Sequence, residues 1–168
     1  MWGAVKHVVT GHDHLVGPWV SKKTGGTWVP GSGVTVGLFD DEKGILAGVL
    51  YDSFNGANVQ MHVAAIPGRG WLCREFLWFC FYYPFVQLGC KRVTGIVSAS
   101  NADARKFDEH LGFQLEATLK DAHPDGDLLV YVMHKKDCRW LNLRRGLDSG
   151  DIQKTGDADC ESVISQPH

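Results

Sequence analysis

Between Arg92 and Phe113 the chain passes from an extended segment directly into a helix, and this unit constrains the fold most. The stretch from Arg92 to Val97 is rich in β-branched residues, which favour strands. Asn101 can cap a helix through its side chain, and the amphipathic run that follows ends at Gly112, a residue typical of left-handed caps. Because a strand that leads into such a helix needs a sheet for both to pack on, we expect a mixed α/β domain.

Further strand-like segments and helices surround this unit. The predicted strands are Ala4 to Thr10, Val34 to Phe39, Ile45 to Tyr51, Val59 to Ile66, Arg92 to Val97, Phe113 to Lys120 and Asp127 to His134. The predicted helices are His12 to Lys23, Trp71 to Leu88 and Asn101 to Leu111. Because the second helix is apolar on nearly all sides and contains Pro84, we expect it to be buried and kinked.

The charge and the cysteine content argue against several classes of protein. A formal net charge of −2 with 21% charged residues gives no bias towards nucleic acid or an anionic membrane. The longest apolar stretch, Phe76 to Leu88, is shorter than the roughly 20 residues of a membrane span. An odd number of cysteines without a C-x-x-C pair favours reduced thiols, and no export signal is visible before Thr10, so we expect a cytoplasmic protein.

Aromatic side chains crowd the segment from Trp71 to Phe85. They could stack on RNA bases, but no basic residues are interleaved with them, so packing in the core is the stronger interpretation. Part of this surface could contact a second copy of the chain in a homodimer. All the predicted elements lie in residues 1–141, whereas residues 142–168 are mostly polar. We therefore expect one domain over 1–141, followed by a poorly ordered tail over 142–168.

The strand-to-helix unit resembles the corresponding segment of the GCN5-related N-acetyltransferase (GNAT) family. In that family a strand ending V-x-x-x-N leads into N-x-x-A and a helix that closes with L-G-F. The residues that match at this spacing are Val97, Asn101, Ala104 and Leu111-Gly112-Phe113. The resemblance extends over about 34–133, and the chain looks like the short stand-alone acetyltransferases of bacteria and phages. It implies a mostly antiparallel, twisted sheet, splayed between its fourth and fifth strands, with helices on both faces.

Two functions remain open. If the resemblance holds, the protein is an acyltransferase that moves an acetyl group from acetyl-CoA to an amine of a protein or a small molecule, by direct attack in a ternary complex. The alternative is a non-catalytic module that keeps the fold and binds CoA or a protein partner. Neither needs a metal: alternate residues of His12-Asp13-His14 do not share a helix face, and no further ligand cluster stands near them in sequence.

The resemblance also implies which residues hold the coenzyme. After the fourth strand, family members carry a loop R/Q-x-x-G-x-G/A whose amides, at a helix start, bind the pyrophosphate, as the helix dipole favours. Arg69 and Gly70 fit this loop, whereas Leu72 and Arg74 stand where the family prefers small residues, and a solvated helix entry explains both arginines as well. The full set implied is Val63, Ala64, Ala65, Arg69, Gly70, Trp71, Arg74, Asn101, Ala104, Arg105 and Phe107.

A general base is expected, because an ammonium has no free lone pair until it loses a proton. Strand alternation places His62 on one face with Gln60 and Asn58, and histidine is the side chain best suited to proton exchange near neutral pH. His62 is therefore the candidate base, with Asp52 and Glu75 as weaker ones; a hydrogen-bonded structural histidine is the alternative.

The remaining chemistry concerns the thioester. A backbone N–H near Val63 or Ala64 would polarise its carbonyl. Many family members carry a tyrosine that protonates the leaving thiolate where this sequence has Asp108, and an ionised aspartate has no proton to give. Three alternatives stay open: Tyr131 or Ser100 is the acid, the thiolate leaves with the help of solvent, or catalysis is weak. Three aspartates of the last hairpin could attract a cationic amine, although a solvated turn explains them equally well: Asp121, Asp125 and Asp127.

Overall fold

In the computed structural model, which describes residues 4–68 and 70–146, seven strands form one mixed sheet. The strands are β1 (Lys6–Thr10), β2 (Gly33–Asp40), β3 (Gly44–Asp52), β4 (Asn58–Ala65), β5 (Arg92–Ser98), β6 (Gln114–His123) and β7 (Gly126–His134). Their spatial order is β1-β2-β3-β4-β5-β7-β6, and every neighbouring pair is antiparallel except β4 and β5. The predicted mixed α/β class and the mostly antiparallel sheet are confirmed.

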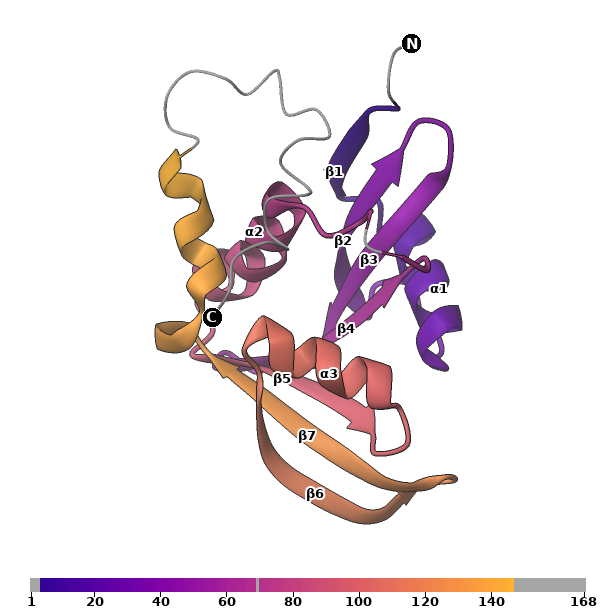
Figure 1. Cartoon of the computed structure of the whole chain (residues 1–168), viewed down its shortest axis with the longest axis vertical. Coiled ribbons are helices and arrows are strands. Elements are labelled where there is room, and N and C mark those ends of the chain that lie inside the picture. The colour runs from indigo at the N-terminus through magenta and orange to yellow at the C-terminus, as the bar shows by residue number, and fades with distance from the viewer. Residues whose placement is uncertain (1–3, 69, 147–168) are drawn as a thin grey trace.

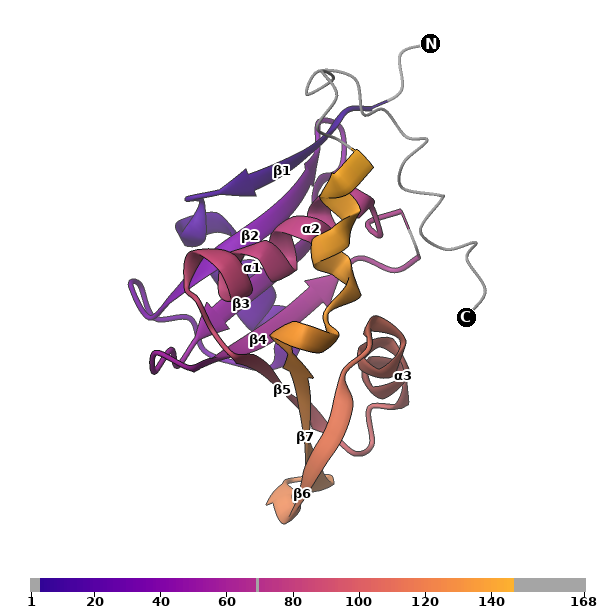
Figure 2. The ribbon, with the colours of Figure 1, turned by 90° about the vertical axis from the view of Figure 1, so that its left-hand side faces the viewer.

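Helices cover both faces of this sheet. They are α1 (Asp13–Thr24), α2 (Arg74–Tyr82), which continues into the π-helical turn η1 (Tyr83–Gln87), α3 (Ala102–Leu111) and the 3-10 helices η2 (Lys135–Asp137) and η3 (Arg139–Gly146). Figure 1 shows α2 and η3 on one side of strands β1 to β4 and α1 on the other, and Figure 2 looks onto the side of α2. Within the described residues, no helix is long and apolar enough to cross a membrane.

The sheet opens between β4 and β5. These two strands pair in parallel at three positions only, Asn58 with Arg92, Val59 with Val93, and Gln60 with Thr94. Beyond Gln60, β4 runs on to Ala65 without pairing with β5, which itself continues to Ser98 beside β7. The predicted splay between the fourth and fifth strands is therefore present.

Two glycines allow α1 to pack closely on the sheet. Gly37 of β2 and Gly48 of β3 are cross-strand partners, so together they make a bare patch. A Cβ on Gly48 would lie 2.7 Å from Val16 and 2.8 Å from Val20, both of which are fully buried on α1. The missing side chains thus allow the helix to approach the backbone of the strands directly.

The second helix begins later than the sequence predicts. Trp71 belongs to the preceding loop, where its indole N–H donates to the Gly68 carbonyl at 3.1 Å, and α2 begins at Arg74. The predicted kink is confirmed as a π-helical turn that contains Pro84. Proline has no N–H for the Cys80 carbonyl four residues earlier, and the hydroxyl of Tyr51 on β3 occupies that carbonyl instead.

The C-terminal helix η3 belongs to the folded domain. Trp140 is buried, its indole N–H donates to the Leu111 carbonyl at 2.8 Å, and its ring stacks at 6.5 Å on Phe81 of α2. The helix runs to Gly146, and Leu143 packs against the core. Packing on the core therefore continues beyond residue 141, where we expected the domain to end. Leu143 makes this contact although the residues around it are mostly polar. The rest of the predicted tail, 147–168, lies outside the described residues.

Candidate active site

Three residues of β4 direct their backbone groups into the opening. The Ile66 N–H donates to the Leu46 carbonyl at 2.8 Å, on the side of β3, whereas the Ala57 carbonyl accepts from the Lys91 N–H at 2.8 Å, on the side of β5. Backbone direction alternates along a strand, so the odd-numbered residues face β5. Those past the last paired position are Met61, Val63 and Ala65.

This alternation separates two of the predicted contacts. The N–H of Val63 faces the opening, where no described strand pairs with it. Ala64 instead pairs with Gly48 on β3, and its side chain is buried in the cluster beneath α1. Of the two amides that the sequence left open, that of Val63 faces the opening between β4 and β5.

The start of α2 lies after the loop that leaves β4. Arg74 is its first residue, partly buried, and has no hydrogen bond or ion pair to a described residue. The amides of the first turn of a helix have no intrahelical acceptor, and the dipole favours an anion there. Gly70 in the same loop is exposed, whereas the predicted Arg69 lies outside the described residues. The arrangement suits a phosphate group.

Trp71 and Phe107 join this loop to α3. Their ring centroids lie 5.2 Å apart, and Trp71 is buried while Phe107 packs on the core from α3. Both were predicted to bind the coenzyme. Their contact brings the two predicted binding segments together on the face of the sheet that carries α2.

The start of α3 has the predicted cap. The Asn101 side chain accepts the Ala104 N–H at 3.1 Å, and Gly112 closes the helix with a φ of 104°. Arg105 donates to the Ala99 carbonyl at 3.3 Å, but its Nε is buried without a partner among the described residues. A hollow of about 230 Å³ borders this helix, lined by Ala102, Arg105, Lys106 and Glu109.

His62 forms a pair with Asp52 on the opposite face. His62 Nε2 lies 3.0 Å from Asp52 Oδ2, and both side chains are about 30% exposed (29% and 30%), so solvent and small ligands can reach them. His62 shares its face with Ala64, which is buried beneath α1. When Nε2 carries the proton bound to Asp52, Nδ1 is free to accept one. The sequence identified each residue separately but not their contact.

The two predicted acids lie elsewhere. Tyr131 is fully buried below α3, its hydroxyl donates to Glu109 at 2.9 Å, and burial raises the pKa of that hydroxyl. Ser100 is exposed, with its Oγ 2.8 Å from that of Ser98. Tyr131 does not share a face of the sheet with His62. Ser100 has no buried setting that would alter the acidity of its hydroxyl.

Asp108 is the residue that sequence reasoning set aside. Its side chain is partly buried and makes no hydrogen bond or ion pair with a described residue. Burial, and then the charge of Glu109, raise the pKa of its carboxyl to about 7. A signal was present: Ala104, Asp108 and Leu111 recur at helical spacing, which places Asp108 on the side of α3 that faces the sheet.

The three aspartates of the last hairpin take part in hydrogen bonds within its turn. Asp127 accepts both the Lys120 ammonium at 2.9 Å and the Asp121 N–H at 3.0 Å, while the Asp125 N–H donates to His123 at 3.1 Å. These contacts support the interpretation as a solvated turn. No three His, Cys, Asp or Glu side chains of the described chain are grouped to hold a metal ion.

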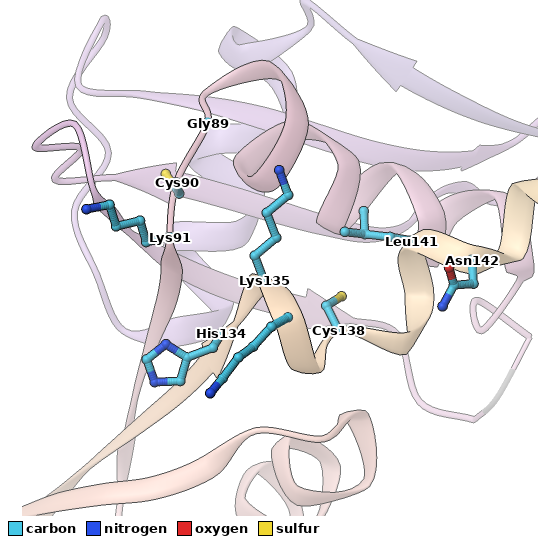
Figure 3. A pocket seen from close by; sticks show the side chains of 9 residues that line it. Gly89, Cys90, Lys91, His134, Lys135, Cys138, Leu141 and Asn142 are labelled. Carbon is cyan, nitrogen blue, oxygen red and sulfur yellow. The ribbon is translucent and has the colours of Figure 1, made fainter.

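Another hollow lies away from all these residues. It has a volume of about 750 Å³ and lies beside the residues that lead into β5 and the end of β7, near the positions where β4 and β5 are still paired (Figure 3). Its lining is Gly89, Cys90, Lys91, His134, Lys135, Lys136, Cys138, Leu141 and Asn142. None of the predicted site residues borders it, so the opening beyond Gln60 remains the candidate site.

Comparison with solved structures finds the same architecture in N-acetyltransferases. The spermidine/spermine N-acetyltransferase SpeG from Vibrio cholerae, in a mutant form, superposes with a TM-score of 0.63 at 14% identity, over 83% of this chain and 96% of that chain. The spermidine N-acetyltransferase from Vibrio cholerae in complex with CoA and spermine gives a TM-score of 0.61 at 14% identity, over 83% and 98%. A probable acetyltransferase gives 0.53 at 20% identity, over 62% and 63%.

No protein-family model matches the sequence, and no curated protein matches it significantly. The likeness is therefore one of structure, and at these identities it establishes the fold. The chain has the fold of the GCN5-related N-acetyltransferases, as the unit from Arg92 to Phe113 had indicated.

Proposed function

We propose that this chain transfers an acetyl group from acetyl-CoA to an amine, by direct attack while both substrates are bound. The observation that carries the proposal is the opening beyond Gln60, where Met61, Val63 and Ala65 turn backbone donors and acceptors towards β5 without pairing with it. The amide-rich pantetheine arm of CoA can pair with such a strand edge as a short peptide does. The fold shared with N-acetyltransferases supports the proposal.

The residues around the opening fit the rest of the coenzyme. The first amides of α2 and Arg74, which has no partner among the described residues, suit the pyrophosphate, and Gly70 lies in the adjoining loop. Arg69, outside the described residues, stays a predicted contact. On the opposite side of the opening, α3 supplies Asn101, Ala104, Arg105 and Phe107 as the second wall. The orphaned Arg105 Nε is the kind of buried donor that a bound acceptor group would satisfy.

The chemistry needs two groups of this chain besides the binding surface. The Val63 N–H, which faces the opening, would polarise the thioester carbonyl, and this oxygen becomes negatively charged as the amine attacks. His62, held by Asp52, is the base that takes the proton of the amine. Because His62 lies on the face opposite to α2 and α3, the amine and the coenzyme would approach the opening from different sides of the sheet.

Isothermal titration with acetyl-CoA tests the binding half of this proposal. We expect a dissociation constant of about micromolar order, and weakening of about tenfold in Arg74→Ala, which corresponds to about 1.4 kcal/mol. Lys135→Ala, in the basic hollow away from the opening, is the matched control and should bind like the wild type. Absence of binding to the wild-type chain would refute the proposal.

A non-catalytic module is the second candidate function. The observation in its favour is Leu72, a bulky side chain at a position where a tight phosphate loop prefers a small residue. Release of free CoA in the presence of amines decides between the two. Since the neighbour solved with spermine is a spermidine N-acetyltransferase, the acceptor panel should hold spermidine beside a lysine peptide. Tight binding of acetyl-CoA without release of CoA for any amine would favour the module.

A further inference from the structure

Acetyl transfer leaves the coenzyme sulfur as a thiolate, which needs a proton. An ordinary thiol has a pKa of about 8.5, so at neutral pH the thiolate readily accepts one from a suitable acid. Tyr131 is a poor source, because its hydroxyl already donates to Glu109 and is fully buried. Ser100 is exposed, and an unassisted hydroxyl is a much weaker acid than a thiol.

We propose that Asp108, in its protonated form, donates this proton to the departing sulfur, directly or through one water. The proposal deepens the acetyltransferase function and rests on it. In the step, the bond from the amine nitrogen to the acetyl carbon forms and the carbon–sulfur bond breaks. The proton of the Asp108 carboxyl passes to sulfur, and the amine proton goes to His62. His62 then releases its proton to solvent and Asp108 takes one up from solvent, which returns both groups to their starting states.

The position of Asp108 is the first argument. Its Oδ2 lies 3.7 Å from the place that a Cβ of Gly95 would occupy, so the carboxyl rests on the bare backbone of β5. Gly95 directly follows Thr94, the last residue of β5 that pairs with β4. The carboxyl is therefore held at the level where the two strands separate, on the same face as Trp71 and Phe107.

The surroundings of Asp108 are the second argument. The charged group that acts on it is Glu109 on its own helix, and Gly95 on β5, which lies beside its Oδ2, brings no charge. Asp108 has no cationic partner among the described residues. Desolvation and a neighbouring carboxylate both disfavour the charged form, which is why the pKa of Asp108 rises to about 7.

These surroundings reverse the objection drawn from the sequence. An aspartate with an ordinary pKa has lost its proton at neutral pH, whereas one with a pKa of about 7 retains it in about half of the molecules. An acid whose pKa lies near the working pH is also the most effective proton donor. A carboxyl kept unpaired in a partly buried position costs stability, and such groups gather at functional sites.

Steady-state kinetics of Asp108→Asn test the proposal, with the acceptor that gives the highest rate for the wild type. We expect kcat to fall about 100-fold, the loss typical of a missing general acid, while the KM and Kd for acetyl-CoA stay unchanged. The wild-type rate should decline as pH rises through about 7, because Asp108 loses its proton there, and Asp108→Asn should lack that decline. Asp103→Asn, an exposed aspartate of the same helix, should retain both the rate and the decline.

The outcomes separate this proposal from the function on which it rests. If the wild type releases no CoA with any amine, the acetyltransferase function fails and Asp108 loses its role with it. If the wild type is active and Asp108→Asn keeps kcat within about twofold, or keeps the alkaline decline, Asp108 is not the acid. Titration with acetyl-CoA shows that the variant is folded, so a loss of kcat with normal binding supports the proposal.

Discussion

The hydroxyl of Tyr51 on β3 donates a hydrogen bond of 2.6 Å to the carbonyl of Cys80 on α2. The N–H that an α-helix would direct to that carbonyl from four residues later is missing, because that residue is Pro84. Tyr51 is 2% exposed and Cys80 likewise, so water is a poor substitute for either group. A side chain of the sheet thus completes a helix that its own sequence interrupts.

Tyr51→Phe should therefore destabilise the protein by about 1–3 kcal/mol, the cost of leaving a buried carbonyl unsatisfied. Urea denaturation measures the change. Tyr83→Phe is the control, because the ring of Tyr83 contacts Tyr51 at 5.0 Å while its hydroxyl has no hydrogen bond to a described residue. Equal losses in the two variants would mean that the hydroxyl of Tyr51 contributes nothing specific.

Gly48→Ala should weaken the packing of α1 on the sheet and so destabilise the protein. The new methyl group would lie 2.7 Å from Val16 and 2.8 Å from Val20, so the helix must move outwards, at a cost of about 1–3 kcal/mol. Thermal unfolding detects the loss. Gly26→Ala, whose nearest neighbour would lie at an ordinary 3.8 Å, should melt close to the wild type. Unchanged melting of Gly48→Ala would show that α1 is not packed against the strands.

Asp52→Asn should lower kcat for acetyl transfer at least about tenfold, because an amide no longer orients His62 or stabilises its charged form. The Kd for acetyl-CoA should stay the same. The chain offers a matched control in His7 of β1 and Asp41 after β2, another histidine–aspartate pair at 3.0 Å, whose side chains are more exposed. Asp41→Asn should have the wild-type kcat, and a similar loss in both variants would contradict a special role for Asp52.

Asp108 should make the stability of the protein depend on pH. In the folded chain its pKa is about 7, against an ordinary value of 3.8, so between these values the folded state binds more protons than the unfolded state. The free energy of unfolding therefore falls as pH rises from about 4 to about 7. Asp108→Asn should be more stable than the wild type by on the order of 2 kcal/mol at pH 8, and nearly equal to it at pH 4.

Urea denaturation of both chains at the two pH values gives this comparison. The same variant would then be slower in catalysis and harder to unfold, a combination that a purely structural carboxyl does not produce. Equal stability at pH 8 would mean that the Asp108 carboxyl is not desolvated in the folded protein.

The elements that follow from local sequence were predictable. Asn101 and Gly112 mark the ends of α3 because both caps depend on residues within the helix and its next neighbours. The start of α2 was predicted too early, since Trp71 has the apolar character of the helix but is held in the loop by the carbonyl of Gly68. Periodicity does not detect such a contact.

The chemistry of the site depends on partners that are distant in sequence. Alternation along β4 predicted the face of His62, but only the pairing of β3 with β4 brings Asp52 to it. The raised pKa of Asp108 was not predictable from the sequence, because it depends on the burial of its side chain in the folded chain and on the charge of Glu109. A sequence displays the type of an ionisable residue, whereas its pKa belongs to the folded surroundings.

The three residue pairs that join β4 to β5 form a short seam between the two halves of the sheet, which Figure 1 shows parting. A pantetheine arm bound along Val63 would extend the contact between the two halves and form the hydrogen bonds that a continuing strand would have formed. Stiffness and catalysis would then depend on the same few bonds. Each time the coenzyme leaves, the sheet would lose these hydrogen bonds at the place where the next coenzyme must bind.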